Sequence, residues 1–331
     1  MRPFAFERAN SPQMAIALMK SGAAAESAFL AGGTTLVDLM KLDVMRPARV
    51  IDINALGATE IALQRDRLRL GASVHMGEAE MHPELCRLVP MLPQSLGLAA
   101  STQIRNMATL GGNVLQRTRC SYFRDVSWQA CNKRAPGSGC AARDGFNRQH
   151  AVLGTSDACV ATYPSDFAQA LIALDATVDI LGPAGRRQIP FATLHVKPDR
   201  TPDVETTLAP GELILGFEMP IEPWLRRSLY LKIRDRQSYE FALASAAVAL
   251  DLVDGSVRQA RIALGGVATV PWRAREAEAA LVGRTPDEAA WQLAADIAFA
   301  DARPLQHNAF KPALGRQTVV RALQQAAVME I

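Results

Sequence analysis

The chain has 331 residues, of which 49% are hydrophobic and 21% charged, and its formal net charge is +3. These values are ordinary for a soluble globular protein of two or three domains, and so small a charge argues against a nucleic-acid-binding surface. No run reaches the roughly 18 unbroken apolar residues of a membrane span, and the first eight residues lack the apolar core of a secretory signal, so we expect no membrane insertion and no export signal on this chain.

Residues 1–57 are predicted to form a small α/β unit. Ser11 and Pro12 supply an N-cap and a first-turn proline for a short amphipathic helix over residues 14–20. Two apolar runs, at residues 29–31 and 49–53, are predicted to be buried strands. This mixture of strands and helices is typical of an α/β subdomain.

A glycine turn, Gly32-Gly33-Thr34-Thr35, joins the first of these strands to a helix predicted over residues 36–40. Glycines let backbone N–H groups approach a pyrophosphate, and a helix N-terminus adds a favourable dipole. Thr35 is a candidate N-cap with Asp38 as its capping-box partner. The motif is neither Gly-x-Gly-x-x-Gly nor a P-loop, so a plain strand-to-helix turn is an equal alternative for this motif alone.

The second region, residues 58–223, alternates strands and helices. Strands are predicted at 67–72 and 177–181, and helices within 90–100 and over 167–174. A second glycine turn, running from Thr109 to Asn113, offers a hydroxyl, open backbone amides and a side-chain amide. Two such turns, about eighty residues apart, indicate a large phosphorylated cofactor held from both sides.

Four of the five cysteines lie in a stretch of about fifty residues after this turn. A loop of that length orders many residues without burying a core, so four thiols within it indicate a metal centre. The intervening intervals of ten, eight and eighteen residues fit no common zinc module and miss the tight ferredoxin spacing, so a zinc ion and disulfides remain alternatives. The four are Cys120, Cys131, Cys140 and Cys159. The fifth, Cys86, is predicted to be a packed hydrophobic residue.

Between residues 117 and 148 the cysteine segment carries seven basic residues and two acidic ones. A cluster held by four thiolates has a net negative charge, and nearby cations would stabilise it. The basic residues are Arg117, Arg119, Arg124, Lys133, Arg134, Arg143 and Arg148, and the acidic ones are Asp125 and Asp144.

The third region, residues 224–331, begins near Pro223-Trp224. Two apolar runs, 244–252 and 257–264, flank Asp254-Gly255, which is a strong hairpin signal. The tail from Ala274 onward is predicted to be mostly helical, with alanine-rich apolar faces.

Taken together, these motifs resemble the flavin-binding subunit of the xanthine dehydrogenase and molybdenum hydroxylase family over nearly the whole chain. The segments 29–36 and 103–113 resemble the two FAD loops of the family, the second being the more specific match. The segment 163–171 is similar to the one whose aspartate contacts the flavin, 208–215 to a later flavin-contacting strand, and Leu231-Lys232 to a lysine-bearing strand.

The resemblance implies an α+β protein with a two-subdomain FAD-binding fold of the PCMH or vanillyl-alcohol-oxidase type, followed by a C-terminal α+β domain with a small antiparallel sheet and helices. Both glycine turns would bind the pyrophosphate and ribityl chain of FAD, Asp166 would hold polar groups of the cofactor, and Lys232 would favour anionic reduced flavin. The implied FAD-binding residues are Phe29, Leu30, Ala31, Gly32, Gly33, Thr34, Thr35, Leu36, Ala100, Thr109, Gly111, Gly112, Asn113, Asp166, Ile214 and Lys232.

The insertion at about residues 116–162 departs from most family members. It resembles the insertion in the flavin subunits of bacterial periplasmic aldehyde oxidoreductases and of 4-hydroxybenzoyl-CoA reductase, which implies a [4Fe-4S] cluster on the four cysteines. The chain would then pass electrons from a molybdenum-cofactor large subunit and a [2Fe-2S] small subunit to an external acceptor, with no catalytic residue of its own. Export to the periplasm with a signal-bearing partner is favoured over a cytoplasmic location.

Three alternatives stay open at this point. One is a free-standing flavin oxidoreductase of the same fold, although we identify no acid–base residues for it. A second is the flavin subunit of an aromatic acyl-CoA reductase. The third is an iron–sulfur scaffold whose flavin site has decayed, against which the intact Gly111-Gly112-Asn113 turn argues.

Overall fold

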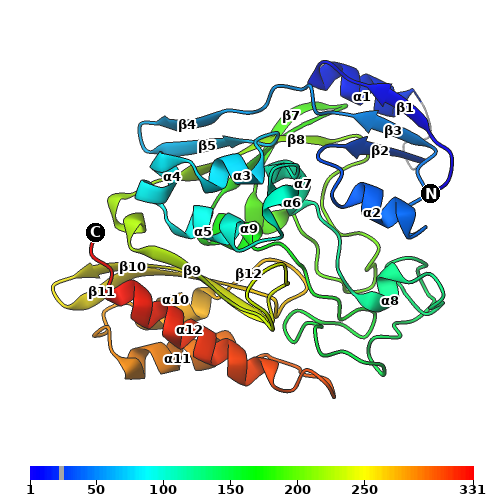
Figure 1. The fold of residues 1–331 in the computed structure, drawn as a ribbon. Helices are drawn as coiled ribbons and strands as arrows, with labels where there is room; N and C mark the ends of the chain where they lie inside the picture. Colours follow the sequence, from blue (N-terminus) through cyan, green and yellow to red (C-terminus); the bar gives the residue numbers. More distant parts are fainter. Residues whose placement is uncertain (22–25) are drawn as a thin grey trace.

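The computed structural model describes residues 1–21 and 26–331, and in this part of the chain three β-sheets carry helices on their faces (Figure 1). The mixed α+β architecture predicted from the sequence is confirmed. Long loops between residues 115 and 166 form a lobe at one side of the molecule, around the short helix α8 (Figure 1).

The N-terminal sheet has three parallel strands in the order β1-β3-β2. The Ser11 hydroxyl caps the first helix by accepting from the Met14 N–H, and Ala15 and Met19 of this helix pack with Ile51 of the central strand. The elements are β1 (Ala5–Arg8), α1 (Pro12–Lys20), β2 (Ser27–Leu30), α2 (Leu36–Lys41) and β3 (Arg49–Asp52). The two predicted strands and both predicted helices are present, and β1 is an additional edge strand.

The second sheet has five antiparallel strands in the order β4-β5-β8-β6-β7. Its strands are β4 (Ile61–Gln64), β5 (Arg67–Gly71), β6 (Thr177–Gly182), β7 (Gly185–Pro190) and β8 (Leu213–Pro220). Helices cover one face, where Leu70, Phe167 and Phe217 contribute to a fully buried core. These helices are α3 (Met76–Glu80), α4 (Pro83–Leu88), α5 (Met91–Gly97), α6 (Thr102–Arg105), α7 (Leu110–Val114) and α9 (Phe167–Ala173), with the 3-10 turn η2 (Phe191–Thr193).

The cysteine segment contains one short helix, α8 (Ser121–Arg124), and is otherwise built of turns. Two small apolar clusters, around Phe123 and around Tyr122, pack it, and polar side chains hold its loops together. The Arg134 guanidinium donates to the carbonyls of Tyr122 and Phe123, and the fully buried Asn147 amide donates to three nearby carbonyls. Hydrogen bonds of this kind satisfy the backbone of a loop that forms no sheet ladder.

The C-terminal sheet has four antiparallel strands in the order β12-β11-β10-β9. The predicted hairpin is confirmed, with Asp254 (φ 50°) and Gly255 (φ 73°) both at the positive φ of a tight hairpin turn. Alanines along β10 let α12 pack closely on the sheet. The elements are η3 (Pro223–Arg226), β9 (Ser228–Ile233), β10 (Ala244–Val253), β11 (Ser256–Gly265), β12 (Trp272–Arg273), α10 (Arg275–Leu281), α11 (Glu288–Ala298) and α12 (Lys311–Ala327).

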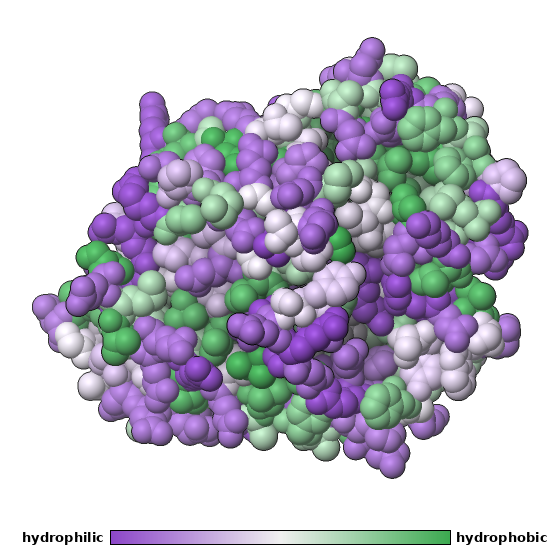
Figure 2. All heavy atoms as spheres, in the orientation of Figure 1, coloured by the Kyte–Doolittle hydropathy of each residue, from purple (hydrophilic) through white to green (hydrophobic). Residues whose placement is uncertain are grey.

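The described helices include none with both the length and the apolar character of a bilayer span. On the face seen in Figure 2, hydrophilic and hydrophobic side chains are interspersed. One expectation about the surface is wrong: Cys86 is exposed, with its thiol beside the carbonyl of Glu80, because it lies on the outer face of the short helix α4.

Candidate functional site

Both glycine turns line one cavity, of about 640 Å³, which we call the glycine-turn cavity. This volume lies in the range of small-molecule and cofactor sites. The first turn leads from β2 into α2, and the second forms the N-terminus of α7, so each presents a helix N-terminus to the cavity. The segment 208–215, which precedes and enters β8, supplies another part of the wall.

The two turns are in direct contact. A Cβ atom added to Gly32 would lie 1.9 Å from the carbonyl oxygen of Met107, so no side chain fits at this position. Thr109 caps the second turn, its hydroxyl accepting from the Gly112 N–H at 3.2 Å. Gly112 in turn faces Ala31, since a Cβ atom there would lie 3.8 Å from that of Ala31. Close backbone approach is therefore the reason for glycine at Gly32.

Most of the sequence-predicted cofactor residues line this cavity. Thr35 precedes α2 but its hydroxyl makes no cap hydrogen bond, so the predicted capping box is wrong. Asp38 instead accepts from Arg119 and Arg124 of the cysteine segment. The cavity-lining members are Phe29, Ala31, Gly32, Gly33, Thr34, Thr35, Leu36, Thr109, Gly111, Gly112 and Ile214, whereas Leu30, Ala100, Asn113, Asp166 and Lys232 lie outside its wall.

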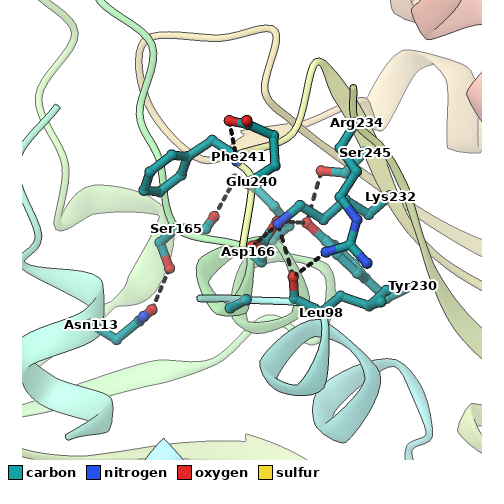
Figure 3. Close-up of polar contacts among 12 residues, drawn as sticks. Leu98, Asn113, Ser165, Asp166, Tyr230, Lys232, Arg234, Glu240, Phe241 and Ser245 are labelled. Atoms are coloured by element: carbon teal, nitrogen blue, oxygen red, sulfur yellow. Dashed lines mark hydrogen bonds and ion pairs between the residues drawn. The ribbon is translucent and has the colours of Figure 1, made fainter. Parts of the chain in front are cut away.

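A second cavity, of about 300 Å³, contains Asp166 in its wall, and we call it the Asp166 cavity. Ser165 joins it to the second glycine turn, because its hydroxyl donates to the Asn113 side-chain carbonyl at 2.5 Å (Figure 3). Phe241, from the loop between β9 and β10, lines the opposite side, and residues of the cysteine segment complete the wall.

Behind Asp166 lies a buried ion pair with Lys232 of β9 (Figure 3). The Lys232 Nζ donates to Asp166 Oδ2 at 2.8 Å and to the Leu98 carbonyl at 3.0 Å, and its side chain is 1% exposed. Leu98 is two residues before Ala100, whose φ of 48° turns the chain at this point. Lys232 therefore acts on the cavity through Asp166 rather than by lining it.

The sequence reasoning missed Tyr230. Its hydroxyl donates to Asp166 Oδ1 at 2.6 Å and also contacts Ser245, and burial together with the Asp166 charge raises the pKa of Tyr230 well above its usual value. Tyr230 is two residues before Lys232, and Ser245 pairs with Lys232 across the sheet, so all three side chains share one face. The two-residue period of a strand could have identified Tyr230 once Lys232 was chosen.

The four cysteines predicted as metal ligands line one small cavity, which we call the cysteine cavity. Cys131 and Cys140 form an isolated antiparallel bridge, and backbone N–H groups point at the sulfurs, among them Ala161 N–H at 3.5 Å from Cys159 Sγ. All four are free thiols. Among the described His, Cys, Asp and Glu side chains, no three converge closely enough to hold a single metal ion.

The pKa values of the thiols differ from one another. A hydrogen bond from Cys159 lowers the pKa of Cys140 to about 6, and the same contact raises the pKa of Cys159. Burial raises the pKa of Cys120 to about 12. Of the seven basic residues counted in this segment, Lys133 is the one found in the wall of the cysteine cavity as the structure describes it.

Five of the seven basic residues, Lys133 among them, anchor the segment to the rest of the protein. Arg117 and Lys133 both pair with Glu205, Arg119 and Arg124 with Asp38, and Arg148 with Asp235. The expectation that these cations surround a cluster is therefore replaced by a role in holding the lobe in place.

Cys120 also belongs to the wall of the Asp166 cavity, and it is the residue that this cavity and the cysteine cavity share. His150 lies beside it, with Nε2 3.1 Å from Cys120 Sγ. Burial lowers the pKa of His150 to about 4, so the ring is neutral at pH 7. The Cys120 thiol thus lies between the two cavities, with the His150 ring in the wall of the Asp166 cavity, and sequence spacing gave no signal for this pair.

The residues present fit two cofactors. Two adjoining glycine turns at helix N-termini suit a pyrophosphate, and the cavity is of cofactor size. Four thiols with backbone N–H donors around one cavity suit a thiolate-held cluster, whose ligands accept such hydrogen bonds.

Comparison with known proteins agrees with the first of these assignments. Residues 2–222 match the family described as the FAD binding domain in molybdopterin dehydrogenase, and residues 229–329 match the CO dehydrogenase flavoprotein C-terminal domain. The chain belongs to this family. It is 44% identical, over 98% of its length and 99% of the relative's, to the aldehyde oxidoreductase FAD-binding subunit PaoB of Escherichia coli. It is 24% identical, over 99% and 98%, to the glyceraldehyde dehydrogenase medium chain of Sulfolobus acidocaldarius.

The fold is that of solved family members. A carbon monoxide dehydrogenase structure from Hydrogenophaga pseudoflava superposes with a TM-score of 0.76 at 26% identity, covering 98% of each chain. The protein is thus an FAD-binding medium subunit of a molybdenum hydroxylase, and its relatives are subunits of oxidoreductases.

Proposed function

We propose that this chain is the FAD- and [4Fe-4S]-binding electron-transfer subunit of a molybdenum-dependent aldehyde oxidoreductase. The observation that carries the proposal is the arrangement of the four insertion cysteines around one cavity that shares Cys120 with the Asp166 cavity. The aldehyde substrate class follows from the relative that is 44% identical over nearly the whole chain.

FAD would bind across the two described cofactor cavities. Backbone N–H groups of the glycine turns would hold the pyrophosphate, and Ser165 and Asp166 would contact the flavin end, with Lys232 and Tyr230 fixing the Asp166 carboxylate. When bound, FAD supplies the exchange between two-electron and one-electron carriers, and the protein sets its position and electrostatics.

A [4Fe-4S] cluster would be held by Cys120, Cys131, Cys140 and Cys159. The N–H groups that point at the sulfurs and the ammonium of Lys133 are the groups expected around thiolates that carry a net negative charge. The cluster would either relay electrons or chiefly hold the lobe together.

The division of the chain follows from this assignment. We assign residues 1–57 and 58–223 to the two FAD-binding subdomains, with the insertion at about 116–162, and residues 224–331 to the C-terminal domain. A molybdenum-cofactor large subunit and a [2Fe-2S] small subunit would complete a heterotrimer that delivers electrons to an external acceptor, after export with a signal-bearing partner.

The test is to co-express the chain with its two partner subunits, purify the complex without oxygen, and measure FAD, iron and zinc per flavin subunit. The iron content of a complex in which the four insertion cysteines are replaced is subtracted from that of the wild-type complex. The difference is the iron bound by this chain. We expect one FAD and about four irons attributable to the insertion, without zinc. Zinc in place of iron, or no metal difference, would refute the cluster.

Single substitutions Cys120→Ser, Cys131→Ser, Cys140→Ser and Cys159→Ser should each lower the iron content. The control is Cys86→Ser, since Cys86 is exposed and is not part of the cysteine cavity wall. Full iron in any of the four variants would remove that residue from the ligand set.

A further inference from the structure

In the Cys120–His150 contact, Nε2 of the buried His150 ring lies 3.1 Å from the sulfur of the cysteine that lines both cavities. An imidazole with a single N–H carries its proton on either Nε2 or Nδ1. When Cys120 is a thiolate, a proton on Nε2 donates to the sulfur, whereas a proton on Nδ1 would leave two lone pairs facing each other. Nδ1 is buried and has no hydrogen-bond partner among the described residues, so nothing opposes the tautomer with the proton on Nε2.

His150 is held from several sides. Its backbone N–H donates to the Asn147 carbonyl at 3.0 Å, and its own carbonyl accepts from the buried Asn308 side chain at 3.2 Å. Asn147 in turn accepts from the His307 N–H at 3.0 Å, which links the cysteine lobe to the loop before α12. These contacts fix the backbone from which the His150 ring reaches Cys120.

The preceding residue, Gln149, is fixed in the same way. Lys311, at the start of α12, is fully buried and donates from Nζ to the Gln149 carbonyl at 3.1 Å and to the Gly266 carbonyl at 2.6 Å. Two buried polar side chains, Asn308 and Lys311, thus hold the backbone carbonyls of residues 149 and 150 in place.

We propose that His150 is a positioning residue for the cluster ligand Cys120: its Nε2–H donates to the Cys120 thiolate and raises the reduction potential of the [4Fe-4S] cluster. This inference rests on the proposed function. Reduction adds negative charge to the cluster and its ligands, so a hydrogen bond to a ligand sulfur stabilises the reduced form more than the oxidised form. Because Cys120 is the ligand that borders the Asp166 cavity, the effect falls on the side of the cluster that faces the proposed flavin site.

The experiment uses the anaerobically purified three-subunit complex with His150→Phe, which removes the donor and keeps a ring, and His150→Gln, which keeps an N–H donor. Iron and FAD per flavin subunit are measured first, followed by a redox titration monitored by electron paramagnetic resonance. We expect His150→Phe to retain its iron and to show a lower midpoint potential for this cluster. His150→Gln should have a midpoint potential close to that of the wild type.

The matched control is His195→Phe. His195 is a partly buried histidine whose Nε2 lies 2.9 Å from the Val114 carbonyl instead of a cysteine. The control should leave the cluster potential unchanged.

Three results would overturn the inference. An unshifted potential in iron-loaded His150→Phe would refute the hydrogen bond's role while leaving the cluster in place. Loss of iron from both His150 variants would make His150 a requirement for assembly rather than for the potential. A wild-type insertion that binds no iron would refute the proposed cluster itself, and this outcome is separable because it is read from the iron content of the unmutated complex.

Discussion

At the scale of single residues, the feature that most constrains the site is the buried charge of Asp166. A carboxylate in this position is tolerable only because Lys232 neutralises it and Tyr230 donates a second hydrogen bond. The three side chains come from the N-cap of α9 and from one face of β9, so two distant segments must be folded before the charge is satisfied. The carboxylate that reaches the Asp166 cavity is therefore pre-positioned rather than mobile.

Lys232→Met should lower the free energy of unfolding by about 3–5 kcal/mol, because it leaves a buried carboxylate without its cation. Bound FAD per chain should fall as well. Urea unfolding and the flavin absorbance of the purified protein measure the two effects. In the double variant Asp166→Asn/Lys232→Met the loss of stability should be smaller than the sum of the single losses, since neither charge is left alone.

Arg234→Met is the matched control for this prediction. Arg234 also donates to the Leu98 carbonyl at 3.0 Å, but it is only partly buried and pairs with no buried carboxylate there. Arg234→Met should lower the free energy of unfolding by much less than Lys232→Met does. Equal losses in the two variants would mean that the Leu98 carbonyl, and not the ion pair, carries the energy.

Gly32→Ala should abolish FAD binding and destabilise the fold by about 1–3 kcal/mol, the usual range for overpacking. The added methyl group would collide with the Met107 backbone carbonyl, which cannot rotate away as a side chain would. The two glycine turns would then separate. Flavin content and thermal unfolding are the measurements.

Gly57→Ala serves as its control. Gly57 has a φ of 73°, so alanine there is strained by about 1–2 kcal/mol, but nothing lies within 4 Å of the added Cβ atom. We expect this variant to keep its FAD. Loss of flavin from both variants would show that general instability, and not the contact between the turns, empties the site.

At the scale of elements, the parts that local sequence determines were predictable and the parts that depend on distant partners were not. The β10–β11 hairpin follows from Asp254-Gly255 alone, and α1 from Ser11-Pro12. Strand β1 gave no signal, because its side chains are mostly exposed and it is held by parallel pairing with β3, more than forty residues away.

The same distinction applies to the site. The glycine turns and the four cysteines could be selected from the sequence, because each carries its chemistry in a short motif or in its own side chain. The partners of the basic residues could not, since Glu205 and Asp38 lie on other elements, outside the cysteine segment. For the same reason His150 could not be assigned to Cys120 before the fold was known.

The stability of the protein should depend on pH through Lys311, the buried first residue of α12. Burial lowers the pKa of Lys311 to about 7, while the unfolded chain holds this proton up to an ordinary lysine pKa near 10.5. Between these values the unfolded state binds more protons, so the Lys311 contribution to stability rises with pH, by at most about 1.4 kcal/mol per pH unit. Below about pH 7 both states are protonated and the slope vanishes.

Urea unfolding of the wild type and of Lys311→Met at several pH values from 6 to 9.5 checks this. The difference in unfolding free energy, wild type minus variant, should increase with pH above about 7. Lys20→Met, which removes an exposed lysine, should show a constant difference. A constant difference for Lys311→Met as well would mean that Lys311 keeps its proton in the folded protein throughout.

At the scale of the whole molecule, the glycine-turn cavity is assembled from parts that belong to two different sheets. The first turn lies between β2 and α2 beside the three-stranded sheet, while the second turn lies in α7, which packs on β8 of the five-stranded sheet, and the segment 208–215 leads into that strand. A ligand that contacts all of them binds the folded protein and not the unfolded chain. Occupancy of this cavity should therefore stabilise the molecule as a unit.

Removing FAD should accordingly lower the melting temperature, and adding it back at about 100 times its dissociation constant should restore about 2.7 kcal/mol, equivalent to a rise on the order of 5 to 10 °C. Calorimetry of the deflavinated protein, with and without added FAD, measures this. Gly57→Ala should respond as the wild type does, whereas Gly32→Ala should not respond, because its two turns no longer meet. If FAD raised the melting temperature of Gly32→Ala by the same amount as that of the wild type, this result would mean that FAD binds without the contact between the two turns. The link that the cavity makes between the two sheets would then not explain the stability of the loaded protein.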